Sequence, residues 1–83
     1  MTHALKTINP FYKAVADREK TFEVRKADRP FSVGDKLLLQ EYSEQGGYSG
    51  QEEEFRITYI LDGGQFGIEK GFCVLGIKEI EKY

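Results

Sequence analysis

Alternation of apolar and polar residues with a period of two dominates the pattern of this chain. Such alternation is typical of β-strands that bury one face. Five segments have this pattern or the composition of strands: residues 3–8, 21–26, 35–43, 53–62 and 72–80. The pattern is clearest in the fourth of these segments. It places one set of side chains, Phe55, Ile57, Tyr59 and Leu61, on one face and the others, Arg56, Thr58 and Ile60, on the opposite face.

Only the stretch between the first two predicted strands has the period of a helix. Phe11, Ala14 and Val15 recur there at spacings of three and four residues, which predicts an apolar stripe on one helix face. Asn9 is the predicted N-cap, and Pro10 occupies the first helical position, where its missing N–H costs nothing. A helix this short is stable only when it packs against the rest of the fold.

The predicted order is therefore one strand, one helix and then four strands, with a glycine-rich hairpin loop at residues 44–50. A doubly wound sheet needs repeated strand–helix units, so this order excludes it. We expect a mainly β fold of the α+β class, a small and strongly curved barrel or half-barrel of five to six strands. The helix after the first strand would plug one open end, and Gly71 and Gly76 would mark bends in the sheet.

Length and composition limit the organisation of the chain. Its 83 residues, 40% of them hydrophobic, predict a single domain over residues 1–83 with one small core. Apolar runs such as Leu37–Leu39 and Phe72–Leu75 are too short for a transmembrane helix or a signal peptide. Cys73 is the only cysteine, so an internal disulfide is excluded and a buried structural thiol is expected. Cytoplasmic residence without membrane contact is the resulting prediction.

Charge is distributed unevenly between the two halves of the chain. Residues 1–39 carry eight Lys/Arg and five Asp/Glu, a net charge of +3, whereas residues 40–83 carry four and nine, a net charge of −5. An extended basic surface for nucleic acid is therefore not expected, because affinity for phosphate grows with the number of cationic contacts. A local basic pocket built from the first half is compatible with this distribution.

The second predicted strand carries the most informative charges and allows two interpretations. In the first, Phe22 and Val24 face the core, and Glu23 and Arg25 form a solvated pair that contributes roughly 0–1 kcal/mol. In the second, the charges line a cleft and bond to one another. The first strand of a small barrel can pair beside the second, which would add charged residues to that cleft. The other candidate members are His3, Lys6, Lys20, Asp28 and Arg29.

Other kinds of site have weaker support. A single histidine, His3, and a single cysteine argue against a metal site, and no glycine-rich phosphate motif occurs, so neither a metal nor a cofactor is predicted. Tyr42 and Tyr48 flank the glycine-rich loop. They either form a platform on which nucleic-acid bases stack or pack against each other as a cross-strand pair.

A longer motif carries a resemblance to a known family. The order Lys-x-x-Glu-x-Arg, then a polar stretch, then Gly-Asp before an apolar strand resembles the ASCH domain, a branch of the PUA-like superfamily. The similarity is closer still to a small subfamily of unknown function that is often associated with phages and mobile elements, and it spans essentially the whole chain. The matching residues are His3, Leu5, Lys6, Lys20, Phe22, Glu23, Arg25, Asp28, Arg29, Val33, Gly34, Asp35, Glu41, Tyr42, Tyr48, Gly50, Gly71 and Phe72.

The resemblance implies a PUA-like β-barrel with a cleft between barrel and helix, at which Lys20, Glu23 and Arg25 would lie. ASCH domains are generally regarded as RNA-binding or associated with RNA modification. One ASCH branch is similar to amidohydrolases that remove the acetyl group from N4-acetylcytidine, with a Lys, a Thr and a later Glu as catalytic residues. Lys20 matches the Lys, whereas Glu23 stands in place of the Thr and the later Glu has no secure counterpart.

Three functions are compatible with these observations. The favoured one is a module that binds RNA or a nucleotide. Lys20 and Arg25 would contact phosphate or base acceptors, and Glu23 would accept from a base amino group or orient Arg25. The second is a small hydrolase of nucleoside amides with Lys20 or Glu23 as catalytic groups, although a neighbouring carboxylate stabilises a lysine in its charged, non-nucleophilic form. The third is a phage-type factor that binds a protein.

Overall fold

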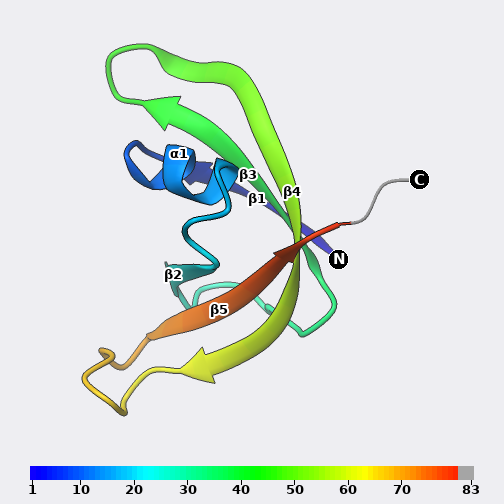
Figure 1. Cartoon of the computed structure of the whole chain (residues 1–83). Coiled ribbons are helices and arrows are strands. Elements are labelled where there is room, and N and C mark those ends of the chain that lie inside the picture. Colours follow the sequence, from blue (N-terminus) through cyan, green and yellow to red (C-terminus); the bar gives the residue numbers. More distant parts are fainter. Residues whose placement is uncertain (81–83) are drawn as a thin grey trace.

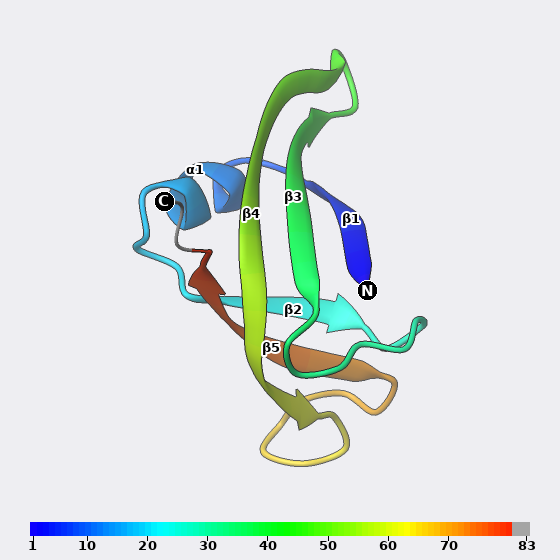
Figure 2. The same cartoon turned by 90° about the vertical axis from the view of Figure 1, so that its right-hand side faces the viewer.

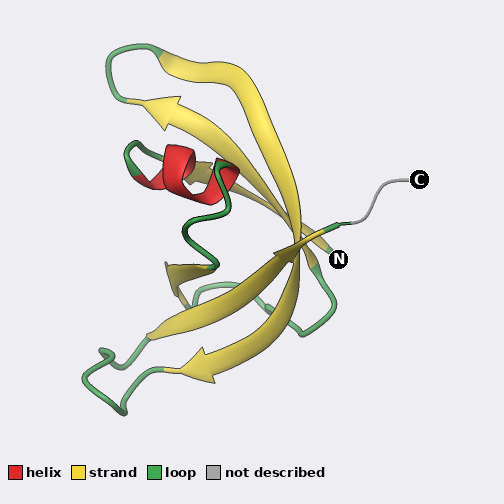
Figure 3. Ribbon diagram, viewed as in Figure 1, coloured by secondary structure: helices red, strands yellow, loops and turns green. Residues whose placement is uncertain are grey.

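One sheet of five strands and one short helix make up the structure, a computed structural model that describes residues 1–80 (Figure 1). In chain order the elements are β1 (Thr2–Thr7), α1 (Phe11–Ala16), β2 (Phe22–Lys26), β3 (Lys36–Ser43), β4 (Gly47–Asp62) and β5 (Phe72–Glu79). Figure 3 shows how small the helical part is beside the strands. The mainly β class is thus confirmed, with five strands. No helix of the described part is long and apolar enough to cross a membrane.

The strands follow the order β1-β3-β4-β5-β2, in which β1 pairs with β3 in parallel and the other pairs are antiparallel. The long strand β4 gives the sheet its curl, because its first half pairs with β3 and its second half with β5. It bends strongly along its length (Figure 2). The sheet becomes a half-barrel with α1 on its concave side (Figure 1). Strands β1 and β2 are its two edges, and we call the gap between them the seam.

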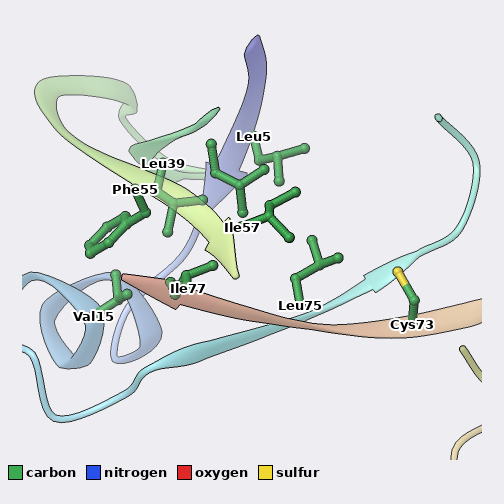
Figure 4. Close-up of a cluster of buried hydrophobic side chains, with 9 residues drawn as sticks. Leu5, Val15, Leu39, Phe55, Ile57, Cys73, Leu75 and Ile77 are labelled. Carbon is green, nitrogen blue, oxygen red and sulfur yellow. The ribbon is translucent and has the colours of Figure 1, made fainter. Parts of the chain in front are cut away.

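The hydrophobic core fills the inside of this curl. Leu39, Ile57 and Leu75, from three different strands, are fully buried, and Val15 of α1 packs against them (Figure 4). Cys73 is buried in the same cluster, as expected, and this burial raises the pKa of its thiol. The side chain therefore has little thiolate character at neutral pH and acts as a small apolar residue.

Helix α1 differs in detail from the helix that the period predicted. It begins at Phe11, with Pro10 rather than Asn9 in the N-cap position. Tyr12 and Val15 are buried, whereas Phe11 is half exposed. The expected stripe was therefore wrong at Phe11, because residues three apart share a helix face and Tyr12 with Val15 presents the larger apolar surface to the core.

Alternation also fails at a bulge in β4. Phe55 and Ile57 are both buried, but Tyr59 is 67% exposed and Ile60 is partly buried against the core. The pairing of β4 with β5 shifts by one residue between Ile57 and Tyr59. A shift of one residue moves every following side chain to the other face of the strand. The prediction for Tyr59 and Ile60 was wrong because a period-two pattern does not show where an extra residue is inserted.

Candidate functional site

Strand β2 reverses the arrangement expected for a solvated charged strand. Glu23 is only 3% exposed, whereas Phe22 and Val24 are 44% and 53% exposed. The face of β2 that turns into the half-barrel thus carries the carboxylate, and the apolar side chains lie on the other face. The interpretation in which Phe22 and Val24 face the core was therefore wrong.

Two cations bind the buried carboxylate of Glu23. Lys20 Nζ donates a hydrogen bond to Glu23 Oε2 and a second one to the carbonyl oxygen of Phe22 at 2.6 Å. Arg25 donates to Glu23 Oε1 through Nε at 3.1 Å and through Nη2 at 2.7 Å. A carboxylate is stable in a buried position only when it is paired and hydrogen-bonded. In residues 1–80 no buried side-chain nitrogen or oxygen lacks a partner.

Arg25 also joins the two edges of the sheet. Its Nη1 donates to the carbonyl oxygen of Lys6 at 3.0 Å and its Nη2 to Thr7 Oγ1 at 3.1 Å, so a side chain of β2 bonds to β1. Arg29 Nη1 lies 3.4 Å from the carbonyl oxygen of Ala4, also on β1. Strand β1 does not pair with β2 through its backbone, contrary to the expectation for a closed barrel. The guanidinium groups instead bind carbonyls on the open edge of β1 and bridge the seam.

A pocket of about 610 Å³ lies in the seam. Pockets of this size commonly hold small ligands. Ile8, Phe11, Phe22 and Val24 form its apolar walls, and each is about half exposed. Three cationic side chains and one carboxylate also line it, which makes the lining net positive. The lining residues are Lys6, Thr7, Ile8, Phe11, Lys20, Phe22, Glu23, Val24 and Arg25.

Most of the hydrogen-bonding capacity of this charged cluster is already used inside the protein. An ammonium group has three N–H donors and a guanidinium five. Lys20 uses two of its three and Arg25 four of its five, so each keeps one donor. Glu23 already accepts three hydrogen bonds. The cluster therefore offers two positively charged donors to an acceptor such as a phosphate or carbonyl oxygen, and little free carboxylate. The ammonium group of Lys6 lies in the same lining.

This arrangement is better suited to binding than to catalysis. A lysine nucleophile must be neutral, but the ammonium group of Lys20 is paired with a carboxylate, which stabilises its charge. A general base must reach the proton that it removes, but the oxygens of Glu23 are already bound to Lys20 and Arg25.

His3, a candidate member of the cleft, is buried at a different place. Its Nε2 lies 2.8 Å from Asp35 Oδ2, and its ring packs edge-on against Phe31 at 4.7 Å. The backbone N–H of Ser32 donates to the same carboxylate oxygen at 3.1 Å. The bond from His3 lowers the pKa of Asp35 below its usual value. This cluster ties the start of β1 to the turn before β3.

Replacing Asp35 with asparagine is expected to reduce the loss of stability that occurs as the pH falls. Because folding lowers the pKa of Asp35, its ionised form stabilises the native state above the unfolded-state pKa of about 3.9. That contribution disappears as the pH falls through the lower native value. Thermal unfolding between pH 6 and pH 2 should show a steeper loss of Tm in the wild type than in Asp35→Asn. Parallel curves for the two proteins would contradict the assigned role.

The remaining candidate residues lie around the pocket but not in it. Asp28 and Arg29 line a smaller hollow of about 160 Å³, which shares Arg25 with the pocket. Tyr42 and Tyr48 are paired residues of β3 and β4 with ring centroids 5.2 Å apart, so the cross-strand pair is confirmed. Lys6 Nζ lies 4.4 Å from the ring centroid of Tyr42. The use of these tyrosines as a stacking platform stays a prediction.

Sequence reasoning missed part of the pocket. It did not identify Thr7, which binds Arg25, or the apolar walls formed by Ile8 and Phe11. One of the two interpretations of β2 placed Phe22 and Val24 in the core. These apolar residues are close in sequence to the charged motif, and this closeness could have indicated that they line the pocket. Their exposure, however, is visible only in the folded chain.

Comparison with known proteins gives the family of the chain. A family model described as a domain of unknown function, DUF3850, matches residues 2–77 and so includes the whole pocket. The chain belongs to this family. The DUF3850 chain is also 37% identical over 60 residues to an uncharacterized 12.9 kDa protein in the GpA 3′ region of Escherichia phage P2. The aligned part covers 72% of this chain and 54% of the phage protein, so the chain spans about half the length of that relative. A small phage-associated domain of unknown function was expected, and both matches agree with it.

Proposed function

We propose that this DUF3850 domain binds RNA or a nucleotide in the seam pocket. The observation that carries the proposal is the convergence of Lys20, Glu23 and Arg25 in one net-positive pocket with apolar walls. A nucleotide combines a flat apolar ring with an anionic phosphate. The pocket offers surfaces that match both parts.

Each pocket residue has a separate role in the proposed binding of a nucleotide. The one free N–H on Lys20 and the one on Arg25 donate to phosphate or to a base acceptor. Glu23 holds both cations in place and keeps their charges within the pocket. Phe11 and Phe22 line the apolar side, where a base ring loses contact with water.

The resemblance to ASCH domains supports the same proposal. That family is regarded as RNA-binding, and the motif residues that the resemblance assigns to its cleft are Lys20, Glu23 and Arg25. All three line the pocket in this structure. A PUA-like assignment for the curled sheet is part of the proposal.

The test is an NMR titration of the 15N-labelled domain with short single-stranded RNAs and nucleoside monophosphates. Shifts are expected at the pocket residues, and Lys20→Met should weaken binding about tenfold or more, since a charge-assisted hydrogen bond contributes roughly 1.5–3 kcal/mol. Lys26→Met is the matched control, because Lys26 is an exposed lysine at the end of β2, outside the pocket.

Salt dependence gives a second readout of the same complex. With two or three cations at the pocket, the logarithm of the RNA association constant should fall with the logarithm of salt with a slope of about −1.5 to −2, since single strands contribute roughly −0.7 for each phosphate neutralised. A titration in which no pocket residue shifts at any ligand concentration would overturn the proposal. Equal affinities of Lys20→Met and Lys26→Met for the ligand would show that Lys20 does not contribute to binding.

A further inference from the structure

The open edge of β2 has main-chain groups that the sheet does not use. In an antiparallel pair, alternate residues direct both N–H and C=O to the same neighbour. Thr21 and Ala27, which flank β2, bond to the β5 side through their carbonyl and N–H respectively. The odd-numbered residues of β2 therefore face β5, and the even-numbered ones, Phe22 and Val24, direct their main-chain groups into the seam.

One side-chain contact supports this direction. Lys20 Nζ donates to the carbonyl oxygen of Phe22 at 2.6 Å, so that oxygen points away from β5 and toward the seam. Val24 is two residues further along β2, so its main-chain groups point in the same direction as those of Phe22. Val24 also lines the seam pocket. No side chain of residues 1–80 bonds to the main chain of Val24. Its N–H and C=O therefore remain as one donor and one acceptor at the pocket wall.

We propose that the main-chain N–H and C=O of Val24 bind the edge of a nucleobase that lies in the seam pocket. The proposal rests on the proposed function and names the group that contacts the base. A nucleobase has an acceptor beside a donor on its pairing edge, such as O4 beside N3–H in uracil, and the two main-chain groups of one residue complement such a pair. Recognition of this kind tolerates different bases but rejects a base whose donor is blocked.

An open strand edge can also pair with a further β-strand. The seam is unsuited to one, because Arg25 crosses it from β2 to the carbonyl oxygen of Lys6 and interrupts the path of a continuous chain. Phe11 lies in the lining of the same pocket. A nucleoside is small enough to bind without displacing the Arg25 bridge.

Replacement of Val24 by proline tests the proposal directly. Proline removes the N–H that faces the seam but no hydrogen bond to β5, and proline is tolerated where the N–H of an edge strand is unpaired. Lys26→Pro is the matched control, because Lys26 has the same main-chain orientation on β2 but does not line the pocket. Uridine monophosphate should bind Val24→Pro at least tenfold more weakly than the wild type, and Lys26→Pro within about threefold of it.

A modified ligand provides a test that does not depend on the folding of a variant. Wild-type protein should bind 3-methyluridine monophosphate, whose N3 donor is blocked, about tenfold more weakly than uridine monophosphate. Equal affinities for the two ligands, or wild-type affinity in folded Val24→Pro, would overturn the inference and leave the proposed function standing. Absence of binding by any RNA or nucleotide would overturn both. A ligand-independent dimer that Val24→Pro dissociates would overturn the inference in favour of strand pairing.

Discussion

Replacing Glu23 with alanine is expected to lower the free energy of unfolding by about 3 kcal/mol. The substitution leaves the like charges of Lys20 and Arg25 close together without the carboxylate that binds both. Removing one partner of a buried ion pair typically costs about 3–5 kcal/mol. The lower end applies here because both cations keep some contact with water. Since domains have about 5–15 kcal/mol of stability in total, the variant should be close to unfolding.

Urea denaturation followed by circular dichroism measures this effect. Glu54→Ala is the matched control, because Glu54 is an exposed residue of β4, and its replacement is expected to change stability by no more than about 0.5 kcal/mol. Glu23→Gln should fall between alanine and the wild type, since the amide keeps an acceptor but loses the charge. A loss below about 1 kcal/mol for Glu23→Ala would show that the cluster is not needed to hold the seam.

The second large effect is expected at the bulge of β4. Ile57→Ala should destabilise the domain by about 2–5 kcal/mol, because Ile57 is fully buried and its truncation leaves a cavity between the strands. Tyr59→Ala removes a larger side chain two residues away but should cost no more than about 0.5 kcal/mol, because Tyr59 is mostly exposed. Simple alternation predicts similar losses at both positions.

The comparison of these two variants by denaturant unfolding therefore tests the bulge itself. A large loss for Tyr59→Ala would place that side chain in the core and contradict the register shift between Ile57 and Tyr59. The m-values of the two variants should equal that of the wild type, so that the midpoints report stability alone.

The alternation of apolar and polar residues predicted where the strands lie, but it did not predict the buried face of every strand. The segments that alternate did become strands, because burial of one face of an extended chain requires a period of two. The faces were predicted correctly in β4 up to Ile57. They were wrong beyond the bulge. In β2 the interpretation that placed Phe22 and Val24 in the core was wrong, because the residue that turns inward is Glu23. Apolar residues usually mark the inner face, but a carboxylate can take their place when cations from neighbouring positions bind it.

The candidate site was only partly accessible to sequence reasoning. The grouping of Lys20, Glu23 and Arg25 was expected, because Lys20 directly precedes the predicted strand that carries Glu23 and Arg25. Proximity of β1 was also expected, but through pairing of the two strands. In the structure the side chain of Arg25 instead reaches Lys6 and Thr7 across the seam, because the curl of the sheet brings its two edges opposite each other. His3 shares β1 with Lys6 but points into the fold and bonds to Asp35, away from the pocket.

The sequence by itself determined the mainly β class, the order of the elements and the charged motif of β2, because each of these depends on residues close together in the chain. Only the tertiary structure decided that Glu23 is buried and that Phe22 and Val24 stay exposed. The curl of β4 brings the edge of β1 opposite that of β2, and Arg25 then bridges the seam. The pocket forms between two edges that are distant in the sheet, and no local pattern specifies how far a sheet curls.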